Sequence, residues 1–123
     1  MPDDYEEVLA QARQLGEAIR RHPRYVKLRE ADQRVRADKA ATDALTAYNQ
    51  AAQEIARKER SGQPVEVDDK RRLQRLRELV AANGSLKAFM AAQADFTELM
   101  RKMNETVYSA IGGPRAPASE PRP

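Results

Sequence analysis

The sequence is poor in the residues on which most catalytic and metal sites depend. It contains no cysteine, no tryptophan and a single histidine among 123 residues. Without cysteine, disulfides and thiolate-ligated zinc or iron–sulfur sites are excluded. The one histidine, His22, cannot supply the two Glu-x-x-His motifs of a di-iron bundle. We expect it to cap a helix or to face solvent beside Pro23.

Other catalytic motifs are missing as well. Gly112-Gly113 is not a phosphate-binding loop, because neither a lysine nor a preceding strand accompanies it. Acidic residues lie three or four positions from basic ones, as is typical of solvated helix faces. The sequence therefore predicts a protein that is not an enzyme and has no metal or cofactor. A cryptic hydrolase is the least favoured interpretation.

Long apolar runs are also missing. No stretch approaches the ~20 apolar residues that a membrane-spanning helix needs. The chain starts with an acidic segment, residues 1–7, where a secretory signal would be cationic and then apolar. From these two observations we expect a cytoplasmic protein without a membrane span.

Helix-forming and charged residues are abundant. Charged residues make up 33% of the chain, and Ala, Leu, Arg, Glu and Gln dominate it, which is typical of helical proteins. The first helix is expected over about Asp3–Arg21, because apolar residues recur there at three- and four-residue steps. These residues are Tyr5, Val8, Leu9, Ala12, Leu15 and Ile19. Gly16 lies within this stripe and costs the helix ~1 kcal/mol, which predicts a close approach by another helix.

Capping and breaking residues place the later helices. Pro23 opens a second helix and Asp38 caps a third, and the pattern leaves open whether these two are continuous. Gly62 ends the third helix in a left-handed conformation, and Asp68 marks the start of the fourth. Ser85 is expected to cap a fifth, most apolar helix of ~40 Å. The sequence thus predicts an all-α, antiparallel bundle of about five amphipathic helices with long central and C-terminal helices.

The last of these helices is the expected site of self-association. Its apolar residues spread over more than the narrow stripe that one neighbouring helix would cover. Its length also exceeds the ~26–30 Å diameter of a compact domain of this size. We therefore expect a homodimer or larger assembly, although the same stripe also suits a core or an adaptable groove for a partner. The candidate self-association residues are Phe96, Met100, Met103 and Val107.

Two segments of the chain are locally basic. Between Arg13 and Lys39 there are nine basic and four acidic residues, and a second cluster runs from Lys70 to Arg77. In the second cluster, the candidate partner-contact residues are Arg71, Arg72 and Arg75. They suit RNA phosphates or an acidic protein surface, but a merely solvated helix face has the same pattern. No aromatic residue lies within the second cluster, which argues against the stacking of nucleobases there.

The order and spacing of several motifs resemble the YlbF/YmcA family of small bacterial helical regulators. The resemblance runs from about Asp3 to Gly112, nearly the whole folded part. It is carried by Val8-Leu9, Leu15-Gly16-Glu17-Ala18-Ile19, Tyr25-x-x-Leu28-x-x-Ala31, Gly62 and Asn83, and by Phe89, Gln93, Phe96, Leu99, Asn104 and Ile111 in the last helix.

The resemblance implies an all-α regulator that self-associates and has no enzymatic activity. Relatives are linked to competence, sporulation and biofilm development, and to complexes that adjust RNA processing by a membrane-anchored endoribonuclease. Some relatives hold an iron–sulfur cluster with cysteines, and this property does not carry over to a chain without cysteine.

Together these inferences predict a helical regulatory domain over residues 1–111. The proline-rich residues 112–123 lack large apolar side chains and are expected to be a disordered tail. The expected function is that of a cytoplasmic, non-enzymatic adaptor. Its expected partners are a second copy of the chain and an unidentified protein, within a complex that modulates RNA processing or developmental gene expression. The alternative is direct binding of nucleic acid through the basic helix faces.

Overall fold

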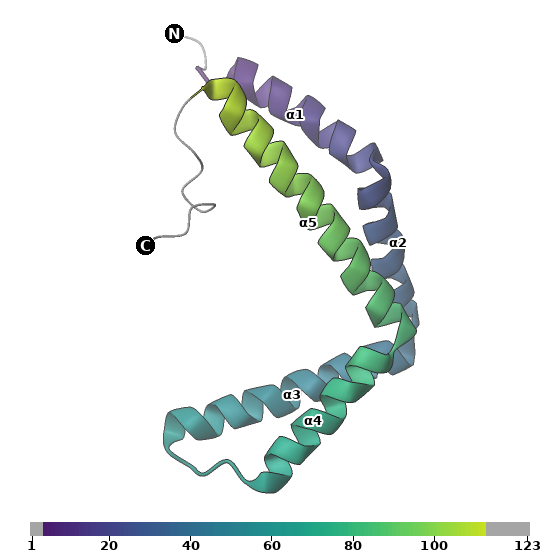
Figure 1. The fold of residues 1–123 in the computed structure, drawn as a ribbon, viewed down its shortest axis with the longest axis vertical. Coiled ribbons are helices and arrows are strands. Elements are labelled where there is room, and N and C mark those ends of the chain that lie inside the picture. The colour runs from purple at the N-terminus through teal and green to yellow at the C-terminus, as the bar shows by residue number, and fades with distance from the viewer. Residues whose placement is uncertain (1–3, 113–123) are drawn as a thin grey trace. The chain divides into compact units, whose positions relative to one another are not determined.

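The computed structural model describes residues 4–112, and within this range all regular structure is helical. The helices are α1 (Glu6–Arg21), α2 (Pro23–Ala37), α3 (Lys39–Ser61), α4 (Val67–Ala82) and α5 (Gly84–Ile111) (Figure 1). The predicted all-α fold with five helices is confirmed. Beyond Gly112, the predicted tail lies outside the described residues, as does Asp3. No helix in the described part combines the length and apolar character needed to cross a membrane.

The chain divides into two compact units, each described by itself. The first unit contains residues up to Lys27 together with those from Ala92 onwards, and the second unit is Leu28–Ala91. The first unit therefore holds α1, the start of α2 and the larger, C-terminal part of α5. The second unit holds the antiparallel α3–α4 hairpin and the adjoining parts of α2 and α5.

Three of the helix junctions consist of one residue each. His22 follows α1, Asp38 follows α2 and Asn83 follows α4, and all three have extended backbone ψ angles of 140°, 101° and 124°. Each side chain accepts a hydrogen bond from a backbone N–H of the next helix. His22 Nδ1 accepts from Arg24 at 3.0 Å, and Asp38 Oδ1 accepts from Ala41 at 3.3 Å. The capping roles predicted for His22 and Asp38 are confirmed, and α2 and α3 are separate helices.

The start of α5 differs from the prediction. The capping oxygen belongs to Asn83, whose Oδ1 accepts from the Leu86 N–H at 2.9 Å. Asn caps helices as well as Ser does, so the helix starts at the earlier of the two candidates. Ser85 lies inside the first turn, where it is buried and hydrogen-bonded to the Asp38 carboxylate. Its predicted capping role was wrong.

The turn between α3 and α4 has the predicted conformation. Gly62 has a φ of 77°, in the left-handed region that glycine adopts without a side-chain clash. The Gln63 N–H donates to the Lys58 carbonyl at 2.9 Å, which satisfies the end of α3. Helix α4 then begins at Val67, one residue before Asp68. The Asp69 carboxylate accepts from the Glu66 N–H at 2.9 Å and closes its first turn.

The core of the molecule lies in the second unit. Val35 from α2, Ala41 from α3 and Leu86 from α5 are buried together, and Leu45, Val80 and Phe89 pack against them. Ala51 and Ala31 are also buried. This core is small because alanine supplies little apolar area for each residue buried.

The first unit is more open. Within it, α1 runs antiparallel to the second half of α5 (Figure 1), yet α1 has no buried residue. Tyr25 packs on Phe96 with ring centroids 5.6 Å apart, and the Arg24 guanidinium donates to the Asp95 carbonyl at 2.8 Å. The close approach predicted at Gly16 is not made within the described chain, because no atom lies within 4 Å of a Cβ placed there.

Candidate functional site

The α3–α4 hairpin is held at its turn by a half-buried ion pair. Lys58 Nζ lies 2.6 Å from Asp69 Oδ2, and their side chains are 20% and 26% exposed. The ammonium lowers the pKa of the Asp69 carboxyl, and that carboxylate in turn raises the pKa of Lys58. Since Asp69 also closes the first turn of α4, one carboxylate fixes both the start of this helix and its distance from α3.

The other end of the hairpin is fixed by the junction residues. The Asp38 carboxylate accepts hydrogen bonds from the Ser85 side chain, the Ala41 N–H and the Asn83 side chain. These bonds, led by that from Ser85, lower the pKa of Asp38, so the carboxylate stays charged. The α2–α3 junction is thereby tied to the α4–α5 junction, and both ends of the hairpin are constrained.

Between these fixed ends lies an open groove, formed by two adjoining hollows of about 530 and 500 Å³. Both hollows are lined by Leu76, Leu79 and Ala82 of α4. On the α3 side, the wall is made by small side chains at helical spacing, which leave room between the helices. The α3 lining residues are Ala40, Asp43, Ala44 and Ala47. We call this the α3–α4 groove.

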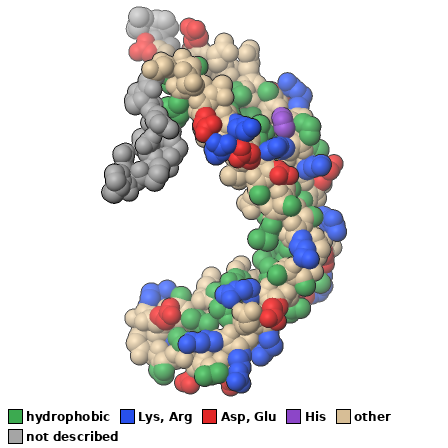
Figure 2. Space-filling view, viewed as in Figure 1, with side chains coloured by type: hydrophobic (Ala, Val, Ile, Leu, Met, Phe, Trp, Pro, Cys, Tyr) green, Lys and Arg blue, Asp and Glu red, His purple; other side chains and the backbone are tan. Residues whose placement is uncertain are grey.

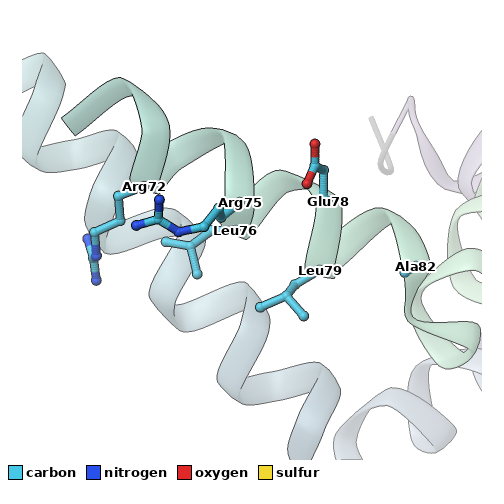
Figure 3. A pocket seen from close by; sticks show the side chains of 6 residues that line it. All are labelled: Arg72, Arg75, Leu76, Glu78, Leu79 and Ala82. Carbon is cyan, nitrogen blue, oxygen red and sulfur yellow. The ribbon is translucent and has the colours of Figure 1, made fainter. Parts of the chain in front are cut away.

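The α4 wall carries an apolar stripe with a cationic end. Arg72, Arg75, Leu76, Leu79 and Ala82 follow each other at three- and four-residue steps and therefore share one face of α4. Figure 3 shows Leu76 and Leu79 on the same side of α4, whereas Glu78, which also lines this hollow, points to the other side. The side chain of Leu79 is 57% exposed, whereas Leu73 and Leu76 on the same helix are half-buried. Leu79 therefore leaves a large apolar surface open to solvent.

The arginines that border the groove are available for binding. Within residues 4–112, neither Arg72 nor Arg75 makes a hydrogen bond or an ion pair, whereas Arg57 pairs with Glu54 and Arg101 with Glu98. In Figure 2, cationic and hydrophobic side chains alternate over the hairpin, which is the lower part of that view. A ligand that combines an apolar face with acidic groups would satisfy both features.

The three candidate partner-contact residues are only partly brought together. Arg72 and Arg75 line the groove, and Arg71 is exposed on α4 but does not line it. Their exposure agrees with the predicted role, which the structure does not test. The basic cluster was visible in the sequence, but the groove was not. The α3 alanines that form its wall have the same spacing as core alanines, so no sequence signal distinguishes them.

The candidate self-association residues all lie on the part of α5 that belongs to the first unit. Phe96, Met100 and Met103 are half-buried, and Val107 is 44% exposed. The apolar stripe continues through Tyr108 and Ile111, which are 42% and 69% exposed. The apolar surface predicted to bind a second copy is therefore partly covered at Phe96, Met100 and Met103 and exposed from Val107 towards the end of α5.

The fold and the groove together define an all-α protein that presents an open apolar surface with a cationic border. The sequence profile of the family described as "Control of competence regulator ComK, YlbF/YmcA" matches residues 8–112. The chain belongs to this family, as the resemblance indicated. Similar proteins include UPF0342 proteins of Streptococcus pyogenes serotypes M4 and M49. Each is 26% identical to this chain over 106 residues, covering 86% of this chain and 94% of the relative.

Proposed function

We propose that this protein is a non-enzymatic adaptor that acts in the cytoplasm by binding a regulatory protein partner in the α3–α4 groove. The observation that carries the proposal is the groove itself. It is an apolar channel between α3 and α4, which are fixed at both ends, and it continues into a hollow on α4 beside Arg72 and Arg75. Within residues 4–112, these two guanidinium groups make no ion pair. A constrained groove binds a partner helix without first having to order its own walls.

The family gives this binding a regulatory setting. The family description names control of the competence regulator ComK. Relatives that this chain resembles are linked to complexes that adjust RNA processing. In our proposal, the adaptor places its partner within such a complex, which modulates RNA processing or developmental gene expression. No reaction step is assigned to the chain.

A capture experiment in the native host tests the groove. Bait protein carrying Leu79→Ser and Arg72→Glu should retain at least about tenfold less of any specific partner than unmodified bait, since central apolar and arginine contacts dominate such interfaces. The matched control is Gln53→Ser with Arg60→Glu on α3, outside the groove residues. Equal capture by the groove variant and the control would exclude the groove as the partner site.

Direct binding of nucleic acid is the second candidate function, favoured by the exposed Arg71, Arg72 and Arg75. Anisotropy of a labelled single-stranded RNA separates the two. A phosphate-binding protein loses affinity steeply as salt rises, because it releases condensed counterions. Tight RNA binding with a steep salt dependence, lost on changing the three arginines to glutamine, would replace the protein-binding proposal. We expect weak binding without preference for sequence.

Self-association is the other part of the proposed function. It would bury the stripe of Phe96, Met100, Met103 and Val107 against a second copy, most simply about a two-fold axis. Its support is the exposure of apolar side chains in the first unit, where α1 has no buried residue.

Light scattering tests the assembly directly. Unmodified protein should show at least twice the chain mass of 13.9 kDa at micromolar concentration. Changing Met103 to Glu should dissociate it, because the assembly would bury an unpaired charge. Lys102→Glu, at an exposed neighbouring position, is the matched control and should leave the mass unchanged. A mass of one chain for the unmodified protein would refute self-association.

A further inference from the structure

Helix α1 carries an apolar stripe that the described chain leaves largely uncovered. Tyr5, Val8, Leu9 and Leu15 recur at three-, four- and seven-residue steps, and they are 71%, 68%, 44% and 38% exposed. Such a stripe on a helix normally faces another element, since its exposure to water costs free energy in proportion to its area. The stripe of α1 therefore requires a partner surface.

Gly16 lies on the same face of α1 as this stripe. In the middle of a helix, glycine is less favourable for helix stability than any residue except proline. No neighbouring atom lies within 4 Å of a Cβ placed at Gly16, so no contact within the described chain explains why this residue lacks a side chain. A glycine at this place allows the backbone of a second helix to approach closely. The groove offers a matching surface, because its α3 wall is built from Ala40, Ala44 and Ala47.

The charges of α1 and of the groove are complementary end to end. Asp4 lies before the start of the stripe, and Glu6 and Arg13 lie seven residues apart on one flank beside it. In the groove, two arginines and one acid, Glu78, line the hollow at one end, and Asp43 lies on α3 near the other end, beside Ala40 and Asn83. If α1 lay in the groove parallel to α4, its acidic start would lie beside the groove arginines. At the other end, Arg13 would lie beside Asp43.

The present partners of these charges do not prevent such an exchange. Arg13 pairs with Glu6 and Asp43 with Lys39, but all four side chains are more than 60% exposed. Exposed ion pairs contribute little to stability and re-form readily with other partners. Length also agrees: Glu6 to Arg13 on α1 and Arg75 to Ala82 on α4 each span seven residues, roughly 10 Å of helix.

We infer that the α3–α4 groove of one chain binds helix α1 of a second copy, with α1 parallel to α4. This inference rests on the proposed function of the groove as a protein-binding site and names its occupant in the free protein. An external partner that enters the groove must then displace α1, so this contact between copies, unlike the one proposed for the α5 stripe, competes with partner binding.

Cross-linking between two differently tagged copies tests the inference, and the lack of native cysteine makes it specific. One copy carries Ala12→Cys in the α1 stripe, and the other carries Ala82→Cys in the groove. A short bis-maleimide should give the mixed dimer. The matched control replaces Ala82→Cys with Gln53→Cys, an exposed α3 position outside the groove. Mixed product no greater than this control would refute the inference.

Charge reversal tests the direction of docking. Asp4→Arg with Glu6→Arg in the first copy, or Arg72→Glu with Arg75→Glu in the second, should each lower the mixed product roughly tenfold through like-charge contacts. Combining both reversals should restore it. Loss without restoration would refute parallel docking. Gly16→Leu should also lower the product while leaving the helix content of the protein unchanged, whereas unchanged product would refute the close approach.

The remaining outcomes separate this inference from the proposed function. Host-partner capture that depends on Leu79 and Arg72, without the mixed cross-link, would preserve the adaptor role and reject α1 as the occupant. A cross-link that forms only within a single chain carrying both cysteines would assign the groove to its own α1, and would also refute the second copy.

Discussion

The two units of the molecule differ in what they bury. Among the described residues, all six buried side chains belong to the second unit, and the first unit has none. The exposed large apolar residues show the opposite distribution: seven lie in the first unit and three, Val67, Leu79 and Met90, in the second. The second unit thus owes its stability to contacts within the chain, whereas the first unit leaves large apolar side chains exposed within the described residues.

The difference has a local cause. In the second unit, two single-residue junctions meet at Asp38, Ser85 and Asn83, and the helices they connect enclose Leu86. The first unit has one such junction, at His22. Its described contacts between helices include the tilted packing of Tyr25 on Phe96 and one hydrogen bond from the Arg24 side chain to the Asp95 carbonyl. Hydrogen-bonded junctions that face each other create a core, and a single junction does not.

The largest effect should come from removing the central core side chain. Leu86→Ala is expected to lower the free energy of unfolding by about 3 kcal/mol, because a leucine that is 3% exposed leaves a cavity. Val107→Ala is the matched change in the first unit. At concentrations where the chain is monomeric, it should cost less than about 1 kcal/mol. Urea unfolding measures both losses in the free energy of unfolding. Equal losses would contradict the difference in burial between the two units.

The next effect concerns the junction between α4 and α5. Asn83→Ala removes the side-chain oxygen that caps α5 and should lower the free energy of unfolding by about 1 kcal/mol. Asn104→Ala, in the exposed middle of the same helix, is the control and should be neutral or slightly stabilising. If Ser85→Ala proves costly and Asn83→Ala neutral, the assignment of the cap to Asn83 is wrong.

Acid should weaken the second unit through its carboxylates. Hydrogen bonds from Ser85 and Ala41 hold the pKa of Asp38 below its ordinary 3.8, and Lys58 does the same for Asp69. A lowered pKa stabilises the fold above 3.8, and this contribution is lost as pH falls through the lowered value. The urea concentration at which half of the protein is unfolded should therefore decrease when the pH is lowered below about 4. The double variant Asp38→Asn, Asp69→Asn should show a shallower fall, and an unchanged slope would contradict this account.

The smallest effect is expected at the border of the groove. Changing Arg71, Arg72 and Arg75 to glutamine should shift the melting temperature by less than about 2 °C, since these side chains make no described hydrogen bond or ion pair. Calorimetry measures the shift. Lys58→Gln, which breaks the half-buried pair with Asp69, provides the contrast and should cost more. A loss of many degrees in the triple variant would make these arginines structural rather than partner contacts.

Helix ends were predictable from sequence because the interactions that set them are local. Asp38 and Gly62 act within a few residues of themselves, and both predictions were confirmed. The one error, at Ser85, arose where two capping residues lie two positions apart. Sequence alone gives no reason to prefer Asn83, because the choice depends on the Asp38 carboxylate, a partner 47 positions away from Ser85 that binds the serine instead.

The groove was not predictable, because it depends on the angle between two helices. Leu76 and Leu79 belong to the same stripe of α4, but Leu76 is half-buried and Leu79 is 57% exposed. Which leucine faces the core is decided by where α3 lies, and α3 presents alanines to both. Gly16 shows the same limit: its pattern predicts a close neighbour without saying which chain supplies it.

The single-residue junctions also bear on how the backbone opens to solvent. His22, Asp38 and Asn83 each end one helix and hold the first turn of the next through a side chain. Fraying of α1, α2 or α4 at its last turn therefore does not by itself release the Arg24, Ala41 and Leu86 amides. Local opening should stop at each junction. Amide hydrogens are then expected to exchange in blocks whose limits coincide with residues 22, 38 and 83, so that deuterium enters the chain one helix at a time.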